Sequence, residues 1–329
     1  MELVTLSDVQ AAARNIDGVA VRTPLLAAPW AGASRGPQGE AARAGLGVEL
    51  WLKPESLQPV GAFKLRGAYH TVALIPADVR ANGVVAHSSG NHAQALAFTA
   101  RAFGIPCVIV MPDVSSPVKI AATRALGAEV ELVPPPERLN RCAEIAAERG
   151  MTVVPPFDHH DVIAGQGTVG LEIVADLPDV ACVLVPVGGG GLASGVAVAV
   201  KALRPEAVVI GIEPELAGDA AESMAAGELR KWPVELTYRT IADGLRTALS
   251  ERTFAHLRKY VDAVLTVTEA EIESAMRELA VRGRLVVEPS GAVSVAGYLR
   301  HRAALPAGRT VAVLSGGNVG AEALVRVLS

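Results

Sequence analysis

Apolar runs with no polar alternation recur along this chain, and Ala-rich stretches with helical spacing separate them. The runs occupy residues 48–53, 84–88, 107–111, 128–133, 182–187, 207–212 and 310–315. The helix-like stretches between them occupy residues 91–103, 116–127, 139–150 and 192–204. Strands that lack a polar face are typical of parallel sheet covered on both faces by helices. The pattern therefore predicts an α/β protein with doubly wound sheets.

The rest of the chain adds two helices and one irregular stretch. Residues 268–283 begin with Thr268 and an acidic first turn and end at Gly283, and residues 321–328 form the last predicted helix. Residues 31–45 (AGASRGPQGEAARAG) carry Gly, Pro and charge, which predicts an exposed excursion. A length of 329 residues suits about two domains. We expect no regulatory domain after the final helix.

Composition narrows the classes of function. The formal net charge is −4, and Lys and Arg are scattered, whereas a nucleic-acid partner needs a basic stripe. Three cysteines are too few for a disulfide framework or a metal cluster. The N-terminus has neither a basic start nor an apolar stretch, and no run approaches the ~20 apolar residues of a membrane span. We expect a cytoplasmic protein without nucleic-acid or membrane partners.

Two glycine clusters follow predicted strands, VPVGGGGLASG (185–195) and VLSGGNVG (313–320). A strand–glycine–helix turn presents backbone N–H groups at the positive end of a helix, which suits a phosphate or carboxylate. Gly188, Gly190 and Ala193 also fit G-x-G-x-x-A, and Glu213 ends the next strand about twenty residues later. That pattern is typical of dinucleotide-dependent oxidoreductases, and glycine spacing alone leaves this alternative open.

Two further stretches place polar groups in unusual surroundings. SSGNHAQ (88–94) puts several small donors around a glycine at a helix start, more than one N-cap requires. We therefore favour a carboxylate or cofactor site there over a plain cap. In QPVGAFKLRGAY (58–69), Lys64 has apolar neighbours, and desolvation lowers the pKa of an amine. Lys64 is either a structural cation or a reactive amine, and we interpret Arg66 as a local structural cation.

Seven segments, taken in order, resemble the fold-type II pyridoxal-phosphate enzymes, specifically the serine/threonine dehydratase and serine racemase family. They are KPESLQPVGAFKLRGA (53–68), HSSGNHAQALA (87–97), FDHHDVIAGQGTVGLEI (157–173), VPVGGGGLASG (185–195), IADGL (241–245), VVEPSGAVSVA (286–296) and VLSGGNV (313–319). The resemblance runs over nearly the whole chain and outweighs the dinucleotide pattern. It implies two doubly wound open-sheet domains with the cofactor in the cleft between them. Residues 1–82 and 162–329 would form the large domain and residues 83–161 the small one.

The resemblance also implies roles for individual residues. Lys64 would form the Schiff base with pyridoxal phosphate and then act as general base on the α-proton of the substrate. Phe63 would pack on the cofactor ring, Asn91 would bind its phenolic oxygen, and Ser315 would face its pyridine nitrogen. The remaining cofactor contacts, mainly to the phosphate, would come from Gly188, Gly189, Gly190, Gly191, Leu192 and Glu288.

The same resemblance assigns the substrate site and the reaction. The substrate carboxylate would be held by Ser88, Ser89, Gly90, Asn91 and His92, and Ser89 also matches the residue that protonates the opposite face in racemases. The implied reaction is β-elimination from a 3-hydroxy amino acid such as L-threonine or L-serine, giving a 2-oxo acid and ammonia.

Three departures from the family pattern bear on specificity. Phe157 stands where eukaryotic racemases carry Asn, and Thr247 stands where they carry Ser, so elimination is favoured over racemisation. Ala62 replaces the Ser of many relatives. This leaves threonine in doubt, with 3-hydroxyaspartate or a hydroxyectoine breakdown product as alternatives.

The resemblance finally suggests a metal and an oligomer. Glu213, Ala217 and Asp219 match a divalent-cation site of two carboxylates and one backbone carbonyl, and such oxygen ligands suit Mg²⁺ or Ca²⁺. The alternative is a pair of solvated loop carboxylates. The adjacent His159, His160 and Asp161 are predicted to lie in a surface loop. The family resemblance implies a homodimer.

Overall fold

The computed structural model describes residues 2–31, 49–88, 90–115 and 117–329. Most of the predicted excursion at 31–45, and Ser89, lie outside these ranges. The strands are β1 (Leu26–Ala27), β2 (Leu50–Pro54), β3 (Val84–His87), β4 (Cys107–Pro112), β5 (Glu129–Val133), β6 (Thr152–Val153), β7 (Val180–Pro186), β8 (Val208–Pro214), β9 (Ala263–Val267) and β10 (Arg309–Leu314). The main helices are α1 (Leu6–Asn15), α2 (Lys64–Leu74), α3 (Ala77–Arg80), α4 (Asn91–Phe103), α5 (Pro117–Ala125), α6 (Arg138–Arg149), α7 (His160–Asp176), α8 (Gly191–Leu203), α9 (Asp219–Ala226), α10 (Val234–Thr237), α11 (Glu251–Tyr260), α12 (Glu269–Glu278), α13 (Pro289–His301) and α14 (Ala321–Leu328).

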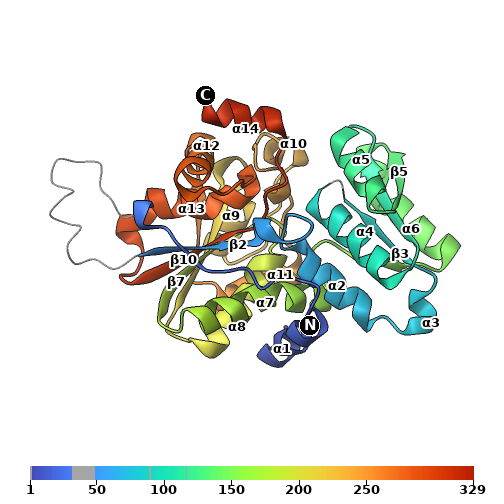
Figure 1. Ribbon diagram of the computed structural model, residues 1–329, viewed down its shortest axis with the longest axis horizontal. Coiled ribbons are helices and arrows are strands. Elements are labelled where there is room, and N and C mark those ends of the chain that lie inside the picture. Colours follow the sequence, from blue (N-terminus) through green and yellow to red (C-terminus); the bar gives the residue numbers. More distant parts are fainter. Residues whose placement is uncertain (1, 32–48, 89, 116) are drawn as a thin grey trace.

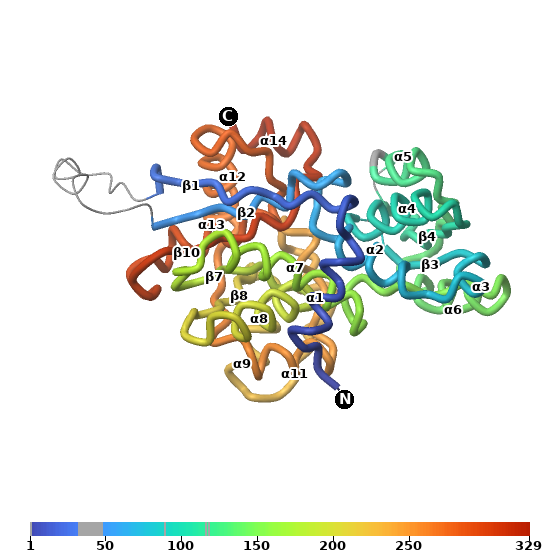
Figure 2. The backbone as a smooth tube through the Cα atoms, turned by 60° about the horizontal axis from the view of Figure 1, so that its bottom comes forward, coloured from blue at the N-terminus to red at the C-terminus, as the bar shows by residue number. Residues whose placement is uncertain are grey.

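The strands form two separate sheets (Figures 1 and 2). The larger has the order β1-β2-β10-β7-β8-β9, parallel except for the antiparallel edge strand β1. The smaller has the order β5-β4-β3-β6 and is parallel throughout. The predicted class, doubly wound α/β with two open sheets, is confirmed. All strands of the smaller sheet fall within residues 83–161, although the exact domain boundaries stay a prediction.

Each face of the larger sheet has its own apolar core, because side chains of a strand alternate between faces. Leu184 and Ala312 join one core with α12 and α13, and Val183 and Val311 join the other with α7 and α8. In Figure 1, α12 and α13 lie above this sheet and α7 and α8 below it. The smaller sheet is covered in the same way by α4 on one face and by α6 on the other. The absence of polar alternation in the strands is therefore explained by burial on both faces.

Several elements of the structure were not predicted from the pattern of apolar residues. The edge strand β9 is short and only partly buried, so its apolar residues do not stand out. Helix α7 contains Gly165, Gly167 and Gly170, and glycine lowers helix propensity. These glycines are needed because α7 crosses α2 and α8 closely; a Cβ at Gly170 would lie 2.7 Å from the Val196 carbonyl oxygen. The surface loop expected at residues 159–161 is wrong, since His159 caps α7 and the next two residues begin it.

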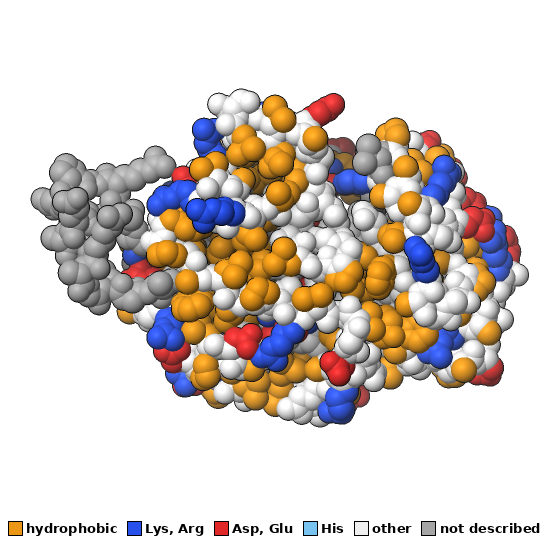
Figure 3. Space-filling view, viewed as in Figure 1, with side chains coloured by type: hydrophobic (Ala, Val, Ile, Leu, Met, Phe, Trp, Pro, Cys, Tyr) orange, Lys and Arg blue, Asp and Glu red, His pale blue; other side chains and the backbone are white. Residues whose placement is uncertain are grey.

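Charged side chains of both signs are mixed on the surface of the protein. Lys and Arg side chains lie interspersed with Asp and Glu over the face drawn in Figure 3, with no basic stripe on that face. Among the described residues, no helix is long and apolar enough to cross a bilayer.

Candidate active site

Lys64 is the first residue of α2, at the junction of the two sheet units. Helix α2 packs against α7 of the larger unit and against α4 of the smaller one. The Lys64 Nζ donates a hydrogen bond to the Pro156 carbonyl oxygen at 2.6 Å and lies 5.0 Å from the centre of the Phe63 ring. Burial lowers the pKa of Lys64 from 10.5 to about 8. At pH 7 roughly a tenth of this amine is thus unprotonated, far more than for an ordinary lysine, and a nucleophile or base requires that form.

The segment before Lys64 is joined to the end of β10. Ala62 pairs with Gly316 in an isolated antiparallel bridge, and the Phe63 N–H donates to the Ser315 carbonyl oxygen at 3.1 Å. The Gly317 N–H donates to the Gly61 carbonyl oxygen at 2.8 Å. The second glycine cluster therefore has a structural role, because its backbone holds the segment that leads into Lys64.

Asn91 joins the smaller unit to the larger one through side-chain hydrogen bonds. Its Nδ2 donates to Glu288 Oε1 at 2.6 Å, and its Oδ1 accepts from Asn318 Nδ2 at 2.8 Å. Asn318 also donates to the Val60 carbonyl oxygen at 2.8 Å. Sequence reasoning missed Asn318, although it sits inside the SGGN motif. Burial, with a smaller effect of Asp243, raises the pKa of Glu288 to about 8, so this carboxyl is largely protonated at neutral pH.

The tetraglycine loop leads from β7 into α8. Gly190 has φ +82° and is the N-cap of α8, and no side chain caps that helix start. A Cβ at Gly188 would lie 2.8 Å from Leu245 Cα, and one at Gly189 would lie 2.6 Å from the Phe157 ring. The loop therefore requires glycine for close packing, and its uncapped helix start offers N–H groups to an anion. Leu192, in the first turn of α8, is buried.

The SSGNHAQ stretch connects β3 to α4. Ser88 Oγ accepts a hydrogen bond from the Gly90 N–H at 3.3 Å, and a Cβ at Gly90 would meet no atom within 4 Å. His92 is buried; its Nε2 lies 2.8 Å from the Val154 carbonyl oxygen and its Nδ1 has no hydrogen-bond partner. Burial and the nearby Lys64 lower the pKa of His92 to about 3. The imidazole is therefore neutral, with Nε2–H donating to Val154.

Ser315 directly follows β10 and is buried, with its Oγ donating to the Ser290 carbonyl oxygen at 3.3 Å. The Ser290 Oγ accepts from the Gly244 N–H at 2.9 Å, so the predicted IADGL segment lies against the same corner. Asp243 of that segment forms an ion pair with Lys119 of α5. This pair is a second polar link between the two sheet units.

Two of the three predicted metal ligands are buried carboxylates. Glu213 accepts hydrogen bonds from the N–H groups of Ala220 (3.3 Å) and Ala221 (2.8 Å), while Asp219 Oδ2 has no partner. Burial is the main cause that raises the pKa of Glu213 well above 4.5 and the pKa of Asp219 to about 6, and Asp219 adds to the shift at Glu213. The alternative of solvated loop carboxylates is wrong. Ala217 is buried beside them at the end of the preceding 3-10 turn.

The predicted residues thus converge from both sheet units. Asn91 contacts Glu288, Phe63 contacts Ser315, and Lys64 and His92 bind carbonyls two residues apart in the chain. A reactive amine, an uncapped helix start for a phosphate, and an amide beside a protonated carboxyl fit pyridoxal phosphate. The buried unpartnered Asp219 oxygen likewise fits a cation. Ser89 lies outside the described residues, so its predicted role stays a prediction.

Comparison with known proteins agrees with this site. Residues 19–316 match the family described as pyridoxal-phosphate dependent enzyme, and the chain belongs to that family. The predicted family and cofactor are confirmed, and the dinucleotide alternative is set aside. Glu213, which that alternative required for a ribose hydroxyl, is instead engaged by backbone N–H groups at the start of α9.

Relatives and solved structures narrow the resemblance. The chain is 40% identical over 294 residues to an L-threo-3-hydroxyaspartate ammonia-lyase of Saccharomyces cerevisiae, covering 86% of this chain and 87% of that one. It is 40% identical over 330 residues to an L-threonine ammonia-lyase of Thermotoga maritima, covering 99% and 79%. The structure of maize serine racemase matches with a TM-score of 0.90 at 32% identity, covering 99% and 97%.

Proposed function

We propose that this chain is a pyridoxal-phosphate-dependent ammonia-lyase, which eliminates water from a 3-hydroxy amino acid and then takes up one water again as ammonia is released by hydrolysis. L-Threonine, L-serine and L-threo-3-hydroxyaspartate are the candidate substrates, and the product is the corresponding 2-oxo acid. The observation that carries this proposal is the Lys64 amine. It is held at the junction of the two sheet units, and burial lowers its pKa to about 8. The names of the relatives support the reaction class.

Bound pyridoxal phosphate supplies an electron sink that stabilises negative charge at the α-carbon of an attached amino acid. Lys64 would hold the cofactor and then, as a free amine, take the α-proton. The glycine loop and the start of α8, residues 188–192, would bind the phosphate through backbone N–H groups. Phe63, Asn91 and Glu288 would contact the ring and its substituents.

Ser315 would set the outcome of the reaction at the pyridine nitrogen. A carboxylate at this position would keep that nitrogen protonated and strengthen the electron sink. The Ser315 hydroxyl would leave that nitrogen largely neutral, so the cofactor would supply a weaker electron sink. Elimination, in which the β-hydroxyl leaves as the α-proton is removed, suffers least from this weaker sink. Ser315 therefore favours elimination.

The substrate carboxylate would lie at the start of α4, in the loop from Ser88 to His92, where N–H groups meet the positive helix end. His92 would contribute its backbone N–H there, because its imidazole Nε2–H is engaged by the Val154 carbonyl oxygen and its Nδ1 is an acceptor. This differs from a role for the imidazole in gripping the carboxylate.

A substrate panel tests the reaction and separates it from racemisation. We expect 2-oxo acid from at least one of L-threonine, L-serine and L-threo-3-hydroxyaspartate, and more pyruvate than D-serine from L-serine. Phe157 supports this order, because its ring lies over Gly189 at the position where racemases are expected to carry Asn. D-Serine in excess over pyruvate, measured by chiral chromatography, would make the racemase alternative correct. The panel also decides whether Ala62 excludes threonine.

Glu288 predicts how the cofactor-free protein responds to pH. Its pKa is about 8 in the folded chain against 4.5 ordinarily, so between these values the folded chain holds a proton that the unfolded chain releases. The contribution of Glu288 to folding stability therefore falls as pH rises from about 4.5 to 8. The Glu288→Gln variant keeps an oxygen for Asn91 and should lose this dependence, with a Tm at pH 8 several degrees above wild type, since each kcal/mol moves Tm by about 2–4 °C in domains of 150–250 residues. Parallel Tm-against-pH curves for the two proteins would contradict the prediction.

We further propose that Glu213, Asp219 and the Ala217 carbonyl bind Mg²⁺ or Ca²⁺. A cation would neutralise two buried carboxylates, so millimolar MgCl2 or CaCl2 should raise Tm by a few degrees, because a ligand present at 100 Kd contributes about 2.7 kcal/mol. The Asp219→Asn variant should show no such rise. Glu222→Gln, an exposed acid in the same first turn of α9, is the control and should respond like wild type. An equal response to NaCl at matched ionic strength would sink the proposal.

The large domain (1–82 and 162–329), the small domain (83–161), a homodimer and a cytoplasmic location also remain proposals. Light scattering during size-exclusion chromatography tests the homodimer directly, and a monomeric mass would refute it.

A further inference from the structure

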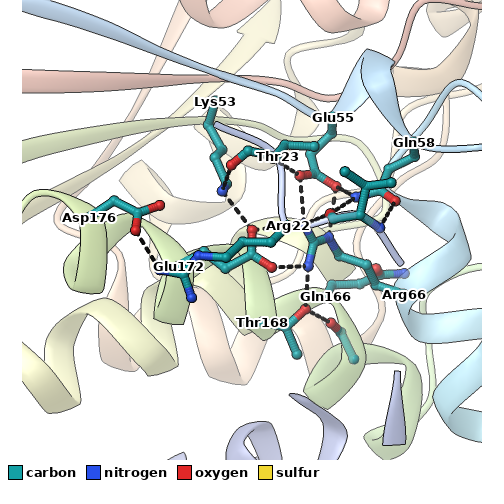
Figure 4. A network of polar contacts seen from close by, with 12 residues as sticks. Arg22, Thr23, Lys53, Glu55, Gln58, Arg66, Gln166, Thr168, Glu172 and Asp176 are labelled. Atoms are coloured by element: carbon teal, nitrogen blue, oxygen red, sulfur yellow. Dashed lines mark hydrogen bonds and ion pairs between the residues drawn. The ribbon is translucent and has the colours of Figure 1, made fainter. Parts of the chain in front are cut away.

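A buried cluster of charged side chains lies where α2 meets α7 and the end of β2 (Figure 4). It contains two cations and two anions, Lys53, Arg66, Glu55 and Glu172. Lys53, Arg66 and Glu55 are fully buried, and the Glu172 side chain is 13% exposed. Opposite charges balance within the cluster. A buried charge is tolerated when it is paired and hydrogen-bonded, and here each one is.

Arg66 is at the centre of this cluster. Its Nε and Nη2 donate to the two carboxylate oxygens of Glu55 at 2.7 and 2.8 Å. Its Nη1 and Nη2 donate to the two oxygens of Glu172 at 2.6 and 3.0 Å. Further bonds run to Thr168 Oγ1 at 3.1 Å and to the Val21 carbonyl oxygen at 3.2 Å. A planar guanidinium held by two carboxylates and two further acceptors has one orientation, which a lysine ammonium cannot reproduce.

These contacts tie α2 to three other parts of the chain. Glu55 follows β2, Glu172 and Thr168 lie on α7, and Val21 belongs to the segment between α1 and β1. That segment is bound in turn, because Lys53 Nζ donates to the Thr23 carbonyl oxygen at 2.5 Å and Thr23 Oγ1 donates to Glu55 at 2.7 Å. The first turn of α2 is thereby fixed to the larger sheet unit from several directions.

Lys64 and Arg66 are separated by two residues, which is about 200° around a helix with 3.6 residues per turn. Their side chains therefore leave opposite faces of α2, Lys64 toward Pro156 and Arg66 toward the cluster. The balanced charges act weakly on Lys64, whose lowered pKa has burial as its cause. What Arg66 can transmit to Lys64 is the rotation and position of the helix.

We propose that Arg66 is a positioning residue, which fixes the rotation of α2 so that the Lys64 amine points into the cofactor site. The inference rests on the proposed function, in which Lys64 carries the cofactor. The Arg66 guanidinium and the Lys64 amine project from opposite faces of the same helix turn. A substitution at Arg66 therefore changes the position of the Lys64 amine without changing the charges around it.

The Arg66→Lys variant tests this, because it keeps the positive charge and removes the planar guanidinium that binds both carboxylates. We expect kcat of the holoenzyme to fall about 10- to 100-fold, as displacements near 1 Å do, with KM changed less than about twofold. The visible circular dichroism per bound cofactor should fall as well, and the pH midpoint of kcat should stay where it is in wild type. Arg141→Lys is the matched control, since Arg141 is likewise an arginine bound by several carboxylates (Glu131, Glu144 and Glu148), but it lies on α6 of the smaller unit. It should leave all of these quantities unchanged.

Each outcome decides the inference. A lower Tm with wild-type kcat and dichroism would make Arg66 merely structural, and a shifted pH midpoint would make its effect electrostatic; either overturns the proposal. If Arg66→Lys does not fold, Glu172→Gln removes one carboxylate with little change of shape and should lower the dichroism and kcat in the same way. The dichroism reports the cofactor alone. It therefore tests the positioning role even if the wild type forms no 2-oxo acid from the panel.

Discussion

Replacing Lys64 with alanine is expected to abolish covalent attachment of pyridoxal phosphate and to lower 2-oxo acid formation by more than about 10³-fold. One amine would supply both the link to the cofactor and the general base, and each role alone carries a large part of the rate. The amine suits both because burial lowers its pKa to about 8. Mass spectrometry after borohydride reduction measures the attachment, and a coupled assay measures the product.

The control for this substitution is Lys259→Ala, which removes an exposed lysine at the end of α11. It should keep wild-type attachment and rate. Lys64→Ala should remain folded, since alanine is a good helix former at the start of α2. Retained activity in a folded Lys64→Ala protein would refute the assignment of this lysine, and with it the proposed function.

The second large effect is expected at Gly190, where alanine should weaken binding of pyridoxal phosphate about 100-fold or more. Gly190 has φ +82°, a conformation that costs an L-residue about 1–2 kcal/mol. A Cβ there would also lie 2.6 Å from Leu249 Cδ2 and 2.9 Å from Thr253 Cβ. The loop must shift to relieve these contacts, and the N–H groups at the start of α8 shift with it. Titration of the cofactor-free protein with pyridoxal phosphate measures the change.

Gly227→Ala separates backbone strain from the effect on the loop. Gly227 has φ +71°, and a Cβ there would meet no atom within 4 Å. It ends α9 as a C-cap, so its substitution should lower stability slightly and leave cofactor affinity unchanged. Equal losses of affinity in the two variants would show that strain alone, and not the position of the phosphate loop, accounts for the result at Gly190.

Together, these two substitutions test opposite ends of the same site. Lys64 comes from the start of α2 and the glycine loop from the start of α8, and Phe157 and Pro156 lie between them in the chain that joins β6 to α7. A shift of that connection would therefore affect both the amine and the phosphate site.

The amino-acid sequence by itself determined the α/β class, most strand positions, the glycine loop and the unusual apolar surroundings of Lys64. The physical reason is that these features are local. Burial on both sheet faces removes polar alternation within a strand, and a lysine among apolar neighbours is visible within a few residues. The family motifs extended this to the cofactor, because they are long and occur in order.

Tertiary structure alone decided the contacts between residues that are distant in the chain. The bond from Asn91 to Glu288 spans 197 residues, and the bonds of Arg66 to Glu172 span 106. The residues around Asn318 in the sequence do not predict its contact with Asn91. Arg66, two residues from Lys64, is held by Glu55 after β2, by Glu172 of α7 and by the Val21 carbonyl oxygen of the N-terminal segment. Such pairings depend on how the helices pack and how the two sheets meet. With a different packing of the helices, the same residues would be exposed to solvent instead of meeting one another.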